Sequence, residues 1–299
     1  MENMIITGVN GLLGQKVLEE AASNFSVLGI DIHDYPFNTK LKFQYERLDL
    51  TDRRLVKDTV LKFYPQYIVN AAAFTNVDEC ENQKELCWKV NVEAVENLIY
   101  VARKIGTKII HISTDYIFDG SAGPYVETDV SAPLGFYGKS KLASENVLLA
   151  SDVEYAILRT MVLYGAGINV RPNFVTWLIQ ALKNKQQVTI VTDQFGNPTL
   201  ADDLAAAVLQ SIKLNKWDIF HVSGSEVIDR YNFALKIAEV FGLESELIKA
   251  TTSAQLNQQA LRPLKSGFIV EKAESELGIH LSNAEEGLKK FKRQYKKYR

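Results

Sequence analysis

Short apolar runs alternate with longer helical patterns along the first two thirds of the chain. The runs are continuous in hydrophobicity, which is typical of strands buried on both faces of a sheet. We expect strands at residues 4–6, 26–30, 67–70, 108–112, 155–158 and 219–222. We expect helices around residues 17–21, 55–61, 86–101, 137–148, 173–184 and 201–213. In the long helix of residues 86–101, the apolar side is expected to hold Leu86, Val90, Val95, Leu98 and Val101.

Strands that alternate with helices indicate an α/β fold with a parallel sheet covered on both faces. From about Val162 the alternation loosens. We therefore expect a doubly wound, Rossmann-type domain over residues 1–161, with a returning segment at about 193–225. A smaller C-terminal substrate-binding lobe is expected from residues 162–192 and 226–299.

Composition narrows the class of protein. Apolar residues make up 46% of the 299 residues and charged residues 23%, close to the average of globular proteins. The net charge of -2 gives no general attraction to nucleic acid or to anionic membranes. No apolar run approaches the roughly 18–20 residues of a membrane span. The first strand follows Met1 almost directly, so we expect no signal peptide and a cytoplasmic protein.

The cysteines and histidines do not indicate a metal site. Cys80 and Cys87 are too few for a disulfide framework, and we expect reduced, packed thiols. The four histidines are scattered and lack metal-ligand spacing, so no metal is expected. The basic tail at 288–299 is typical of a solvated helix end, because cations complement the helix dipole there, with a nucleic-acid patch as the alternative.

A glycine-rich stretch, TGVNGLLG, lies between the first strand and the first helix, with Gly8, Gly11 and Gly14. Glycine permits a tight turn and close approach of the backbone to a pyrophosphate, and the helix N-terminus offers free N–H groups. Asp31 ends the second strand, where an acid can bind the adenosine ribose. The stretch alone could be a plain turn, but with Asp31 it predicts dinucleotide binding. Asp31 favours NADH over NADPH, because its charge opposes a 2′-phosphate.

Two tyrosine–lysine pairs share a spacing of four residues: Tyr137 with Lys141, and Tyr100 with Lys104. Ligands of a parallel sheet gather at the carboxyl ends of its strands. Tyr100 lies near the end of a helix that leads into a strand, so it is expected at the opposite edge. Tyr137 follows the loop after the strand at 108–112 and begins the next helix. Residues four apart share a helix face, so Tyr137 and Lys141 can face the same crevice.

Ketone reduction requires a hydride at carbon and a proton at oxygen. Tyrosine has an ordinary pKa of about 10, and lowering it by about three units requires about 4 kcal/mol. A cation about 4 Å away, at an effective dielectric of about 20, supplies about 4 kcal/mol. Lys141 is thus sufficient as the partner of Tyr137. Thr114, at the end of the strand at 108–112, could hold the carbonyl oxygen, or it could serve only a local turn.

These motifs resemble the extended short-chain dehydrogenase/reductase superfamily. Longer strings resemble the dTDP-4-dehydrorhamnose reductases, which make dTDP-L-rhamnose. The strings are NAAAFTNVDECE (70–81), STDYIFDG (113–120), PLGFYGKSKLASE (133–145), DQFGNPT (193–199) and RPLKS (262–266). The resemblance covers nearly the whole chain. It implies an NAD(P)H-dependent reductase of a nucleotide-linked 4-keto sugar, with a dTDP-linked sugar as the substrate. A homodimer is the expected assembly.

The resemblance also implies roles for single residues. Tyr137 would donate the proton, Lys141 would adjust its pKa and anchor the ribose, and Thr114 would hold the carbonyl. Asp115, Tyr116 and Arg262 would face the sugar nucleotide, with Arg262 suited to its diphosphate. The residues expected to line NADPH or NADH are Gly8, Gly11, Leu12, Leu13, Gly14, Asp31, Asp49, Leu50, Ala71, Ala72, Ala73, Tyr137 and Lys141.

The chain departs from the family pattern at two places. Val162 stands where the family often has tryptophan, and Gln15 follows Gly14 where some members have a metal-binding acid. An epimerase or dehydratase of the same superfamily is an alternative, although dehydratases carry an acid where this chain has Tyr116. A second alternative is a non-catalytic NAD(P)-binding regulatory subunit of the same branch.

Overall fold

The computed structural model describes residues 1–256 and 258–295, and within them seven parallel strands form one sheet. The strand order is β11-β6-β5-β4-β1-β2-β3. From β1 the chain adds β2 and β3 on one side and then β4, β5, β6 and β11 on the other, so a crevice is expected between the carboxyl ends of β1 and β4. The strands are β1 (Glu2–Thr7), β2 (Phe25–Asp31), β3 (Gln44–Arg47), β4 (Tyr67–Asn70), β5 (Lys108–Thr114), β6 (Tyr155–Thr160) and β11 (Ile219–His221).

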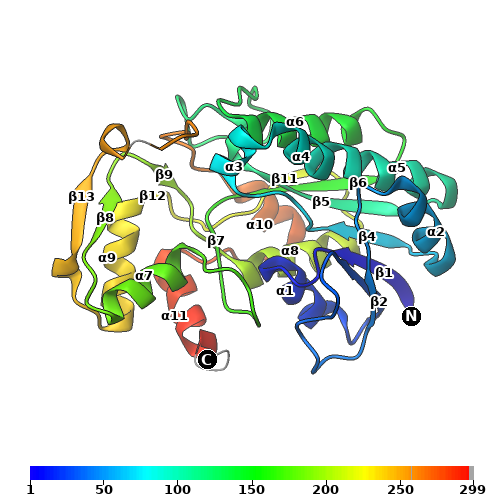
Figure 1. Cartoon of the computed structure of the whole chain (residues 1–299), viewed down its shortest axis with the longest axis horizontal. Helices are drawn as coiled ribbons and strands as arrows, with labels where there is room; N and C mark the ends of the chain where they lie inside the picture. Colours follow the sequence, from blue (N-terminus) through cyan, green and yellow to red (C-terminus); the bar gives the residue numbers. More distant parts are fainter. Residues whose placement is uncertain (257, 296–299) are drawn as a thin grey trace.

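Helices cover both faces of the sheet (Figure 1). On one face lie α2 (Arg53–Phe63), α5 (Ala94–Ile105) and α6 (Phe136–Leu149), and on the other lie α1 (Leu12–Ala21), α8 (Ala201–Lys213) and α10 (Glu271–Leu277). Met4 and Ile6 pack into the core on the α1 side, while Ile5 packs on the α5 side. Both faces of β1 are therefore buried, which explains its continuous apolar run.

A second lobe lies beside the carboxyl edge of the sheet, on the left of Figure 1. Its own apolar core is formed by α7 (Phe174–Lys183), α9 (Arg230–Phe241), α11 (Ala284–Tyr295) and the parallel pair β8 (Val188–Val191) with β13 (Ile248–Thr251). Short pairs join β7 (Leu163–Tyr164) to β10 (Thr199–Leu200) and β9 (Phe195–Gly196) to β12 (Ile228–Asp229). Phe268, Leu277 and Leu281 pack into the core of the sheet.

The six expected strands of the sheet and the fold class are confirmed. The edge strand β3 was missed, because QYER is polar and only half-buried. The long helix at 86–101 is wrong in detail. It consists of α4 (Lys84–Trp88), a π-helical segment at Lys89–Glu93, and α5.

The π-helical segment also corrects the expected apolar face of that helix. A π turn adds a residue to the helical repeat and rotates what precedes it. Val95, Leu98 and Val101 are buried as expected, but Leu86 is 43% exposed and Cys87 is fully buried in its place. Two short elements also lie around the site: the helix α3 (Val77–Asn82) and the 3-10 turn Asp115–Ile117.

Among the described helices, none combines the length and apolar character required to cross a bilayer. The basic tail is described only as far as Tyr295, the end of α11, and the expectation for residues 296–299 lies outside the described residues.

Candidate active site

The glycine turn connects β1 to α1 and is held by close backbone packing. Gly8 has a positive φ of 64°, and a Cβ there would lie 2.9 Å from the backbone of Ala72. A Cβ on Gly14 would lie 2.2 Å from the carbonyl oxygen of Gly8. Only glycine fits either position, so α1 begins directly against the turn. Within the described part of the chain, no hydrogen-bond partner is recorded for its first N–H groups, those of Leu12 and Leu13. This cradle fits a dinucleotide pyrophosphate.

Asp31 lies at the end of β2 beside this turn, but its carboxylate already has protein partners. Oδ2 accepts from the backbone N–H of Asn10 at 3.0 Å, and Oδ1 lies 2.6 Å from Nδ1 of His33. The Asn10 side chain in turn holds the loop after β2, bonding Tyr35 and Phe37. Asp31 therefore braces the turn and the loop together, and the side chain of His33 is about half exposed on the rim.

The other expected cofactor residues lie along the same edge. Asp49 is exposed and Leu50 is 9% exposed, and both follow β3. Residues 71–73 follow β4, where the N–H of Ala72 donates to the Thr7 hydroxyl at 3.3 Å. The structure brings together the carboxyl ends of β1, β2 and β4, as the sequence predicted, and adds that of β3, which the sequence did not predict. The contacts of these residues with a dinucleotide stay a prediction.

Tyr137 and Thr114 meet where β5 ends and α6 begins. Thr114 is the last residue of β5, and Tyr137 lies in the first turn of α6 with 9% of its surface exposed. Burial raises the pKa of Tyr137, and a hydrogen bond with the Thr114 side chain opposes the rise. The Tyr116 ring packs edge-on against the Tyr137 ring, with centroids 5.5 Å apart. The phenol is thus neutral and placed beside a second hydroxyl.

Lys141 lies one turn further along α6, but its ammonium group is not hydrogen-bonded to Tyr137 within the described chain. Nζ donates to the carbonyl oxygen of Ile112 at 2.8 Å and lies 3.0 Å from Nε2 of His111. Burial lowers the pKa of Lys141 to about 8, and the charge of Glu145 opposes this. The expectation that Lys141 lowers the pKa of Tyr137 stays a prediction.

Asp115 and Tyr116 lie in the turn after Thr114. Asp115 is buried and accepts from the hydroxyls of Ser266 at 2.7 Å and Thr114 at 3.1 Å. Burial raises its pKa, while these two hydrogen bonds oppose the rise. Ser266 belongs to the RPLKS string, so this string closes over the site from the C-terminal part of the chain.

Arg262 and Arg230 bring positive charge to the same region. Arg262 forms an ion pair with Asp78, at 2.7 and 3.2 Å, and also donates to the carbonyl of Ala260. Arg230 begins α9 and was missed by sequence reasoning, since only the fold brings it near Asp115. Among the described residues its guanidinium has no hydrogen-bond partner, and it lies 5.6 Å from the ring centroid of Phe174.

The string NVDECE supports the site at four points. Asn76 caps α3, Asp78 binds Arg262, and Glu81 accepts from the N–H of Phe136 at the start of α6 at 2.6 Å. Cys80 is a free thiol, fully buried, with its sulfur 2.9 Å from that of Cys87. Both cysteines pack against Tyr137, which confirms that they are packed residues, while their reduced state stays a prediction.

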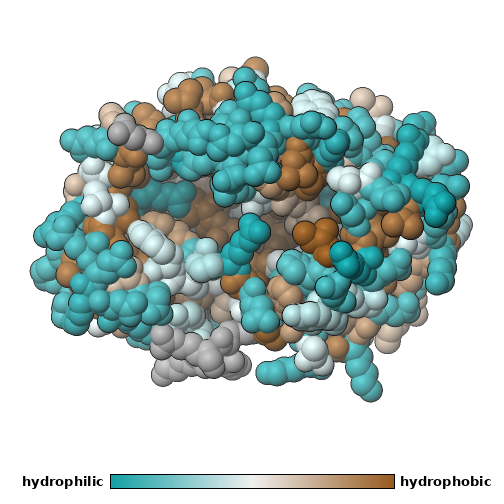
Figure 2. All heavy atoms as spheres, in the orientation of Figure 1, coloured by the Kyte–Doolittle hydropathy of each residue, from teal (hydrophilic) through white to brown (hydrophobic). Residues whose placement is uncertain are grey.

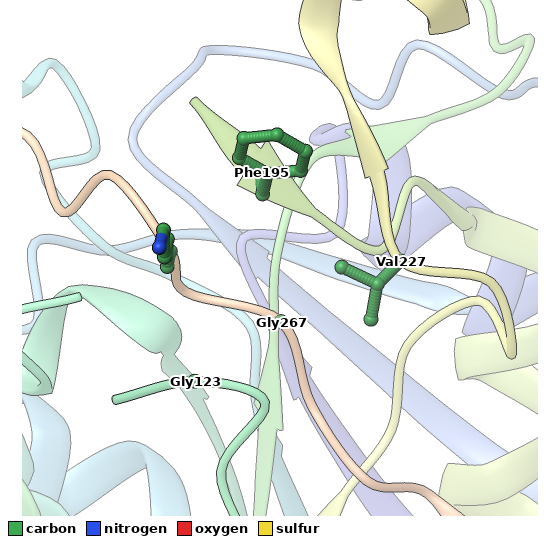
Figure 3. Close-up of a pocket in the computed structure, with 5 residues that line it drawn as sticks. Gly123, Phe195, Val227 and Gly267 are labelled. Atoms are coloured by element: carbon green, nitrogen blue, oxygen red, sulfur yellow. The ribbon is translucent and has the colours of Figure 1, made fainter. Parts of the chain in front are cut away.

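The face shown in Figure 2 is hollowed at its centre, between the sheet and the second lobe, and apolar surface lines its depth. A cavity of about 170 Å³ lies beside the RPLKS string, framed by the Phe195 and Val227 side chains and the backbone of Gly123 and Gly267 (Figure 3). Ser266, between Lys265 and Gly267, carries the hydroxyl that bonds Asp115.

No cluster of three or more His, Cys, Asp or Glu side chains that could hold a metal occurs within residues 1–256 and 258–295. Gln15 stands at the position where some family members have an acid, and its side chain forms hydrogen bonds within the protein. Its Nε2 donates to Asn10 and to Ile168, each at 2.8 Å, and its Oε1 accepts from the N–H of Ile168. It thereby ties the glycine turn to the loop after β7.

The fold, the glycine turn and the tyrosine at the start of α6 define a Rossmann-type protein of the short-chain dehydrogenase/reductase kind. The model of the RmlD substrate binding domain family matches residues 1–297, and the chain belongs to this family.

Relatives of known name support this membership. A dTDP-4-dehydrorhamnose reductase of Aggregatibacter actinomycetemcomitans is 32% identical over 98% of this chain and 99% of its own. The methionine adenosyltransferase 2 subunit beta of Xenopus laevis is 34% identical, covering 83% of this chain and 75% of its own. The crystal structure of dTDP-4-dehydrorhamnose reductase from Bacillus anthracis in complex with NADP has a TM-score of 0.87 at 30% identity, covering 98% of this chain and 99% of that one.

Proposed function

We propose that this protein is an NAD(P)H-dependent reductase of a dTDP-linked 4-keto sugar. The observation that carries the proposal is the meeting of the Tyr137 phenol and the Thr114 hydroxyl at the carboxyl end of β5, on the same edge of the sheet as the glycine turn. Full-length similarity to dTDP-4-dehydrorhamnose reductases supports the reaction type and the sugar class. The known complex of a relative with NADP supports the cofactor class.

The residues of the glycine turn fit the dinucleotide. Gly8 and Gly14 keep the turn tight against Ala72 and against the start of α1, because a Cβ at either position would collide with the protein's own backbone. The N-terminus of α1 would then bind the pyrophosphate at this turn. Asp31, Asp49–Leu50 and residues 71–73 would line the rest of the cofactor along the strand ends. When bound, the reduced nicotinamide supplies the hydride.

Tyr137 is the proton donor in this proposal. Because burial raises its pKa, the phenol retains its proton at neutral pH and can release it to a developing alkoxide. Thr114 would hold the carbonyl oxygen through its hydroxyl. Lys141 would contribute positive charge next to the phenol and anchor the ribose, from a buried position on the same face of α6.

Arg230 and Arg262 would bind the diphosphate of the sugar nucleotide. Burial raises the pKa of Tyr116, and both guanidinium charges oppose this rise. Arg230 likewise opposes the rise that burial causes in the pKa of Asp115. A half-buried arginine without a hydrogen-bond partner in the described chain matches a phosphate, which accepts two parallel N–H bonds. Asp115 and Tyr116 would then face the sugar.

A second candidate is a non-catalytic regulatory subunit, favoured by the similarity to the methionine adenosyltransferase subunit. Net consumption of NADH or NADPH with dTDP-4-dehydrorhamnose supports the reductase and also excludes an epimerase or dehydratase, which recycles its cofactor. Binding of cofactor without turnover of any keto sugar would favour the regulatory role. A homodimer, a cytoplasmic location and the lack of nucleic-acid binding stay predictions of the sequence.

Cofactor preference is tested with Asp31→Ala. The charge of Asp31 opposes a 2′-phosphate, so its loss is expected to narrow the preference for NADH over NADPH. Dissociation constants of both cofactors, measured by fluorescence titration, check this independently of turnover. An unchanged ratio would show that Asp31 only braces Asn10 and His33 and does not contact the ribose.

A further inference from the structure

A buried histidine contacts the ammonium group of Lys141. His111 is on β5 and is 1% exposed. Its Nε2 lies 3.0 Å from Nζ of Lys141 and 3.0 Å from Oγ of Ser144, and both partners belong to α6, which packs on this face of the sheet (Figure 1). Its Nδ1 lies 3.1 Å from Nδ2 of Asn70. Both ring nitrogens therefore have protein partners.

The hydrogen bonds continue to the cofactor turn. Oδ1 of Asn70 accepts from the hydroxyl of Thr7 at 2.7 Å, and Thr7 is the last residue of β1 before Gly8. Thr7, Asn70, His111 and Lys141 are all at least 98% buried, so water does not supply alternative partners. A buried polar group without a partner costs about 1–3 kcal/mol, so each member of this line depends on the next.

The charge of Lys141 and the proton position on His111 are coupled. Burial and the charge of Lys141 hold the pKa of His111 well below its usual value, so the ring is neutral and has one bare nitrogen. When Asn70 donates to Nδ1, the proton is on Nε2, which can donate to Ser144 and to an uncharged Lys141 amine. An ammonium group at Lys141 needs Nε2 bare, which moves the proton to Nδ1 and turns the Asn70 amide.

We propose that His111 is a positioning residue for Lys141: its imidazole accepts a hydrogen bond from the ammonium group and stabilises that charged form in the buried site. This rests on the proposed reductase function, in which a charged Lys141 assists Tyr137. Other groups also face Lys141, and they are unchanged in the variants used below. They are Cys87 on α4 and Glu145 on α6, whose carboxylate pairs with Arg159 on β6.

The first test compares His111→Leu, which removes the acceptor, with His111→Gln, which retains one. A hydrogen bond to a charged group contributes about 1.5–3 kcal/mol, so its loss should move the alkaline limb of kcat/KM down by about one to two pH units. The limb starts near the pKa of Lys141, which is about 8. Below that limb the Leu variant should approach wild-type kcat/KM, and the Gln variant should retain most of the wild-type profile.

His280→Leu is the matched control, because His280 is 68% exposed and pairs only with surface carboxylates in the described chain. Its profile should match the wild type. A purely structural role for His111 predicts instead an equal loss at every pH. An alkaline limb in His111→Leu identical to the wild type would overturn the proposal.

The second test needs neither turnover nor a variant that folds. In ¹⁵N-histidine-labelled wild type, the two ring nitrogens of the buried histidine should exchange donor and acceptor character as pH passes through about 8, without the ring becoming charged. Constant nitrogen shifts through that range would overturn the proposal. If the shifts exchange but no keto sugar is reduced, the positioning holds and the proposed function fails, so the two failures are distinguishable.

Discussion

Two tyrosine–lysine pairs with identical spacing lie in opposite environments. Tyr137 and Lys141, on α6, are 9% and 2% exposed, and they lie where β5 ends. Tyr100 and Lys104, on α5, are half-buried and exposed, near the turn at Gly106 that leads into the start of β5. The two pairs therefore lie at opposite edges of the same sheet, and only one edge carries the glycine turn.

The partners of the two tyrosines differ in the same way. The ring of Tyr100 is covered by the Arg53 guanidinium at 4.0 Å and by Lys104 at 4.8 Å, which is a surface cation–π arrangement. Tyr137 has a hydroxyl and a second aromatic ring as neighbours. The comparison shows that sequence spacing determines which residues share a helix face. The position of that face relative to the carboxyl edge of the sheet determines whether the residues can take part in catalysis.

The largest expected effect concerns the two phenols. A positioned acid contributes about 10²–10⁴ in rate, so Tyr137→Phe should lower kcat by that factor while cofactor affinity changes little. Tyr100→Phe should leave kcat unchanged. Steady-state kinetics and cofactor titration measure both. Near-normal turnover in Tyr137→Phe, or a comparable loss in Tyr100→Phe, would mean that the wrong pair was chosen.

The second prediction compares the arginines that support the two helices. Arg159 forms a buried ion pair with Glu145 of α6, at 2.8 Å, whereas Arg53 is exposed. Arg159→Met leaves the Glu145 carboxylate buried without its partner and should lower the free energy of unfolding by about 3–5 kcal/mol. Arg53→Met should lower it by about 1 kcal/mol or less. Chemical denaturation of both variants measures the two losses in free energy of unfolding. Losses of similar size would contradict the importance of the difference in burial.

The pH profile separates the two lysines. The charged form of Lys141 assists Tyr137, and burial lowers the pKa of Lys141 to about 8. Raising the pH through this value removes the charge, so kcat/KM should fall, approaching about tenfold for each further pH unit. Lys104→Met should leave this limb in place, while Lys141→Met should abolish it at a lower overall rate. A flat wild-type profile up to about pH 9 would argue against a buried lysine as the controlling group.

The smallest effect is the coupling between Arg53 and Tyr100. Exposed cation–π pairs contribute about 0.5–1 kcal/mol. A double-mutant cycle with Arg53→Met and Tyr100→Leu, followed by chemical denaturation, should give a coupling energy in this range and no change in kcat. A change in kcat in any of these variants would indicate that α5 takes part in the reaction.

Most of the fold could be predicted because its signals are local. The apolar runs at 67–70 and 108–112 are buried on both faces and are confirmed as β4 and β5. The predictions failed where contacts with neighbouring elements determine the local structure. The polar β3 is a strand only because β2 offers it backbone partners, and the π turn at Lys89–Glu93 exposes Leu86, which periodicity had placed on the apolar side.

The candidate site was predictable to a smaller extent. The strand ends brought Thr114 and Tyr137 together as expected, because parallel strands end at one edge. The partners of charged groups were not predictable. Arg262 is paired with Asp78, 184 residues away, and the carboxylate of Asp31 is occupied by Asn10 and His33. Arg230 gave no signal beyond being a lone arginine at the start of a helix.

The sequence by itself determined the alternation of the main strands and helices and the place of the glycine turn, and it predicted Tyr137 over Tyr100, because these follow from periodicity, backbone freedom and strand direction. The tertiary structure alone decided where the charges go: Lys141 onto His111 and Ile112, and Arg159 onto Glu145. The reason is that a buried charge must be satisfied by whichever polar group the fold places within about 3 Å, whatever its distance along the chain.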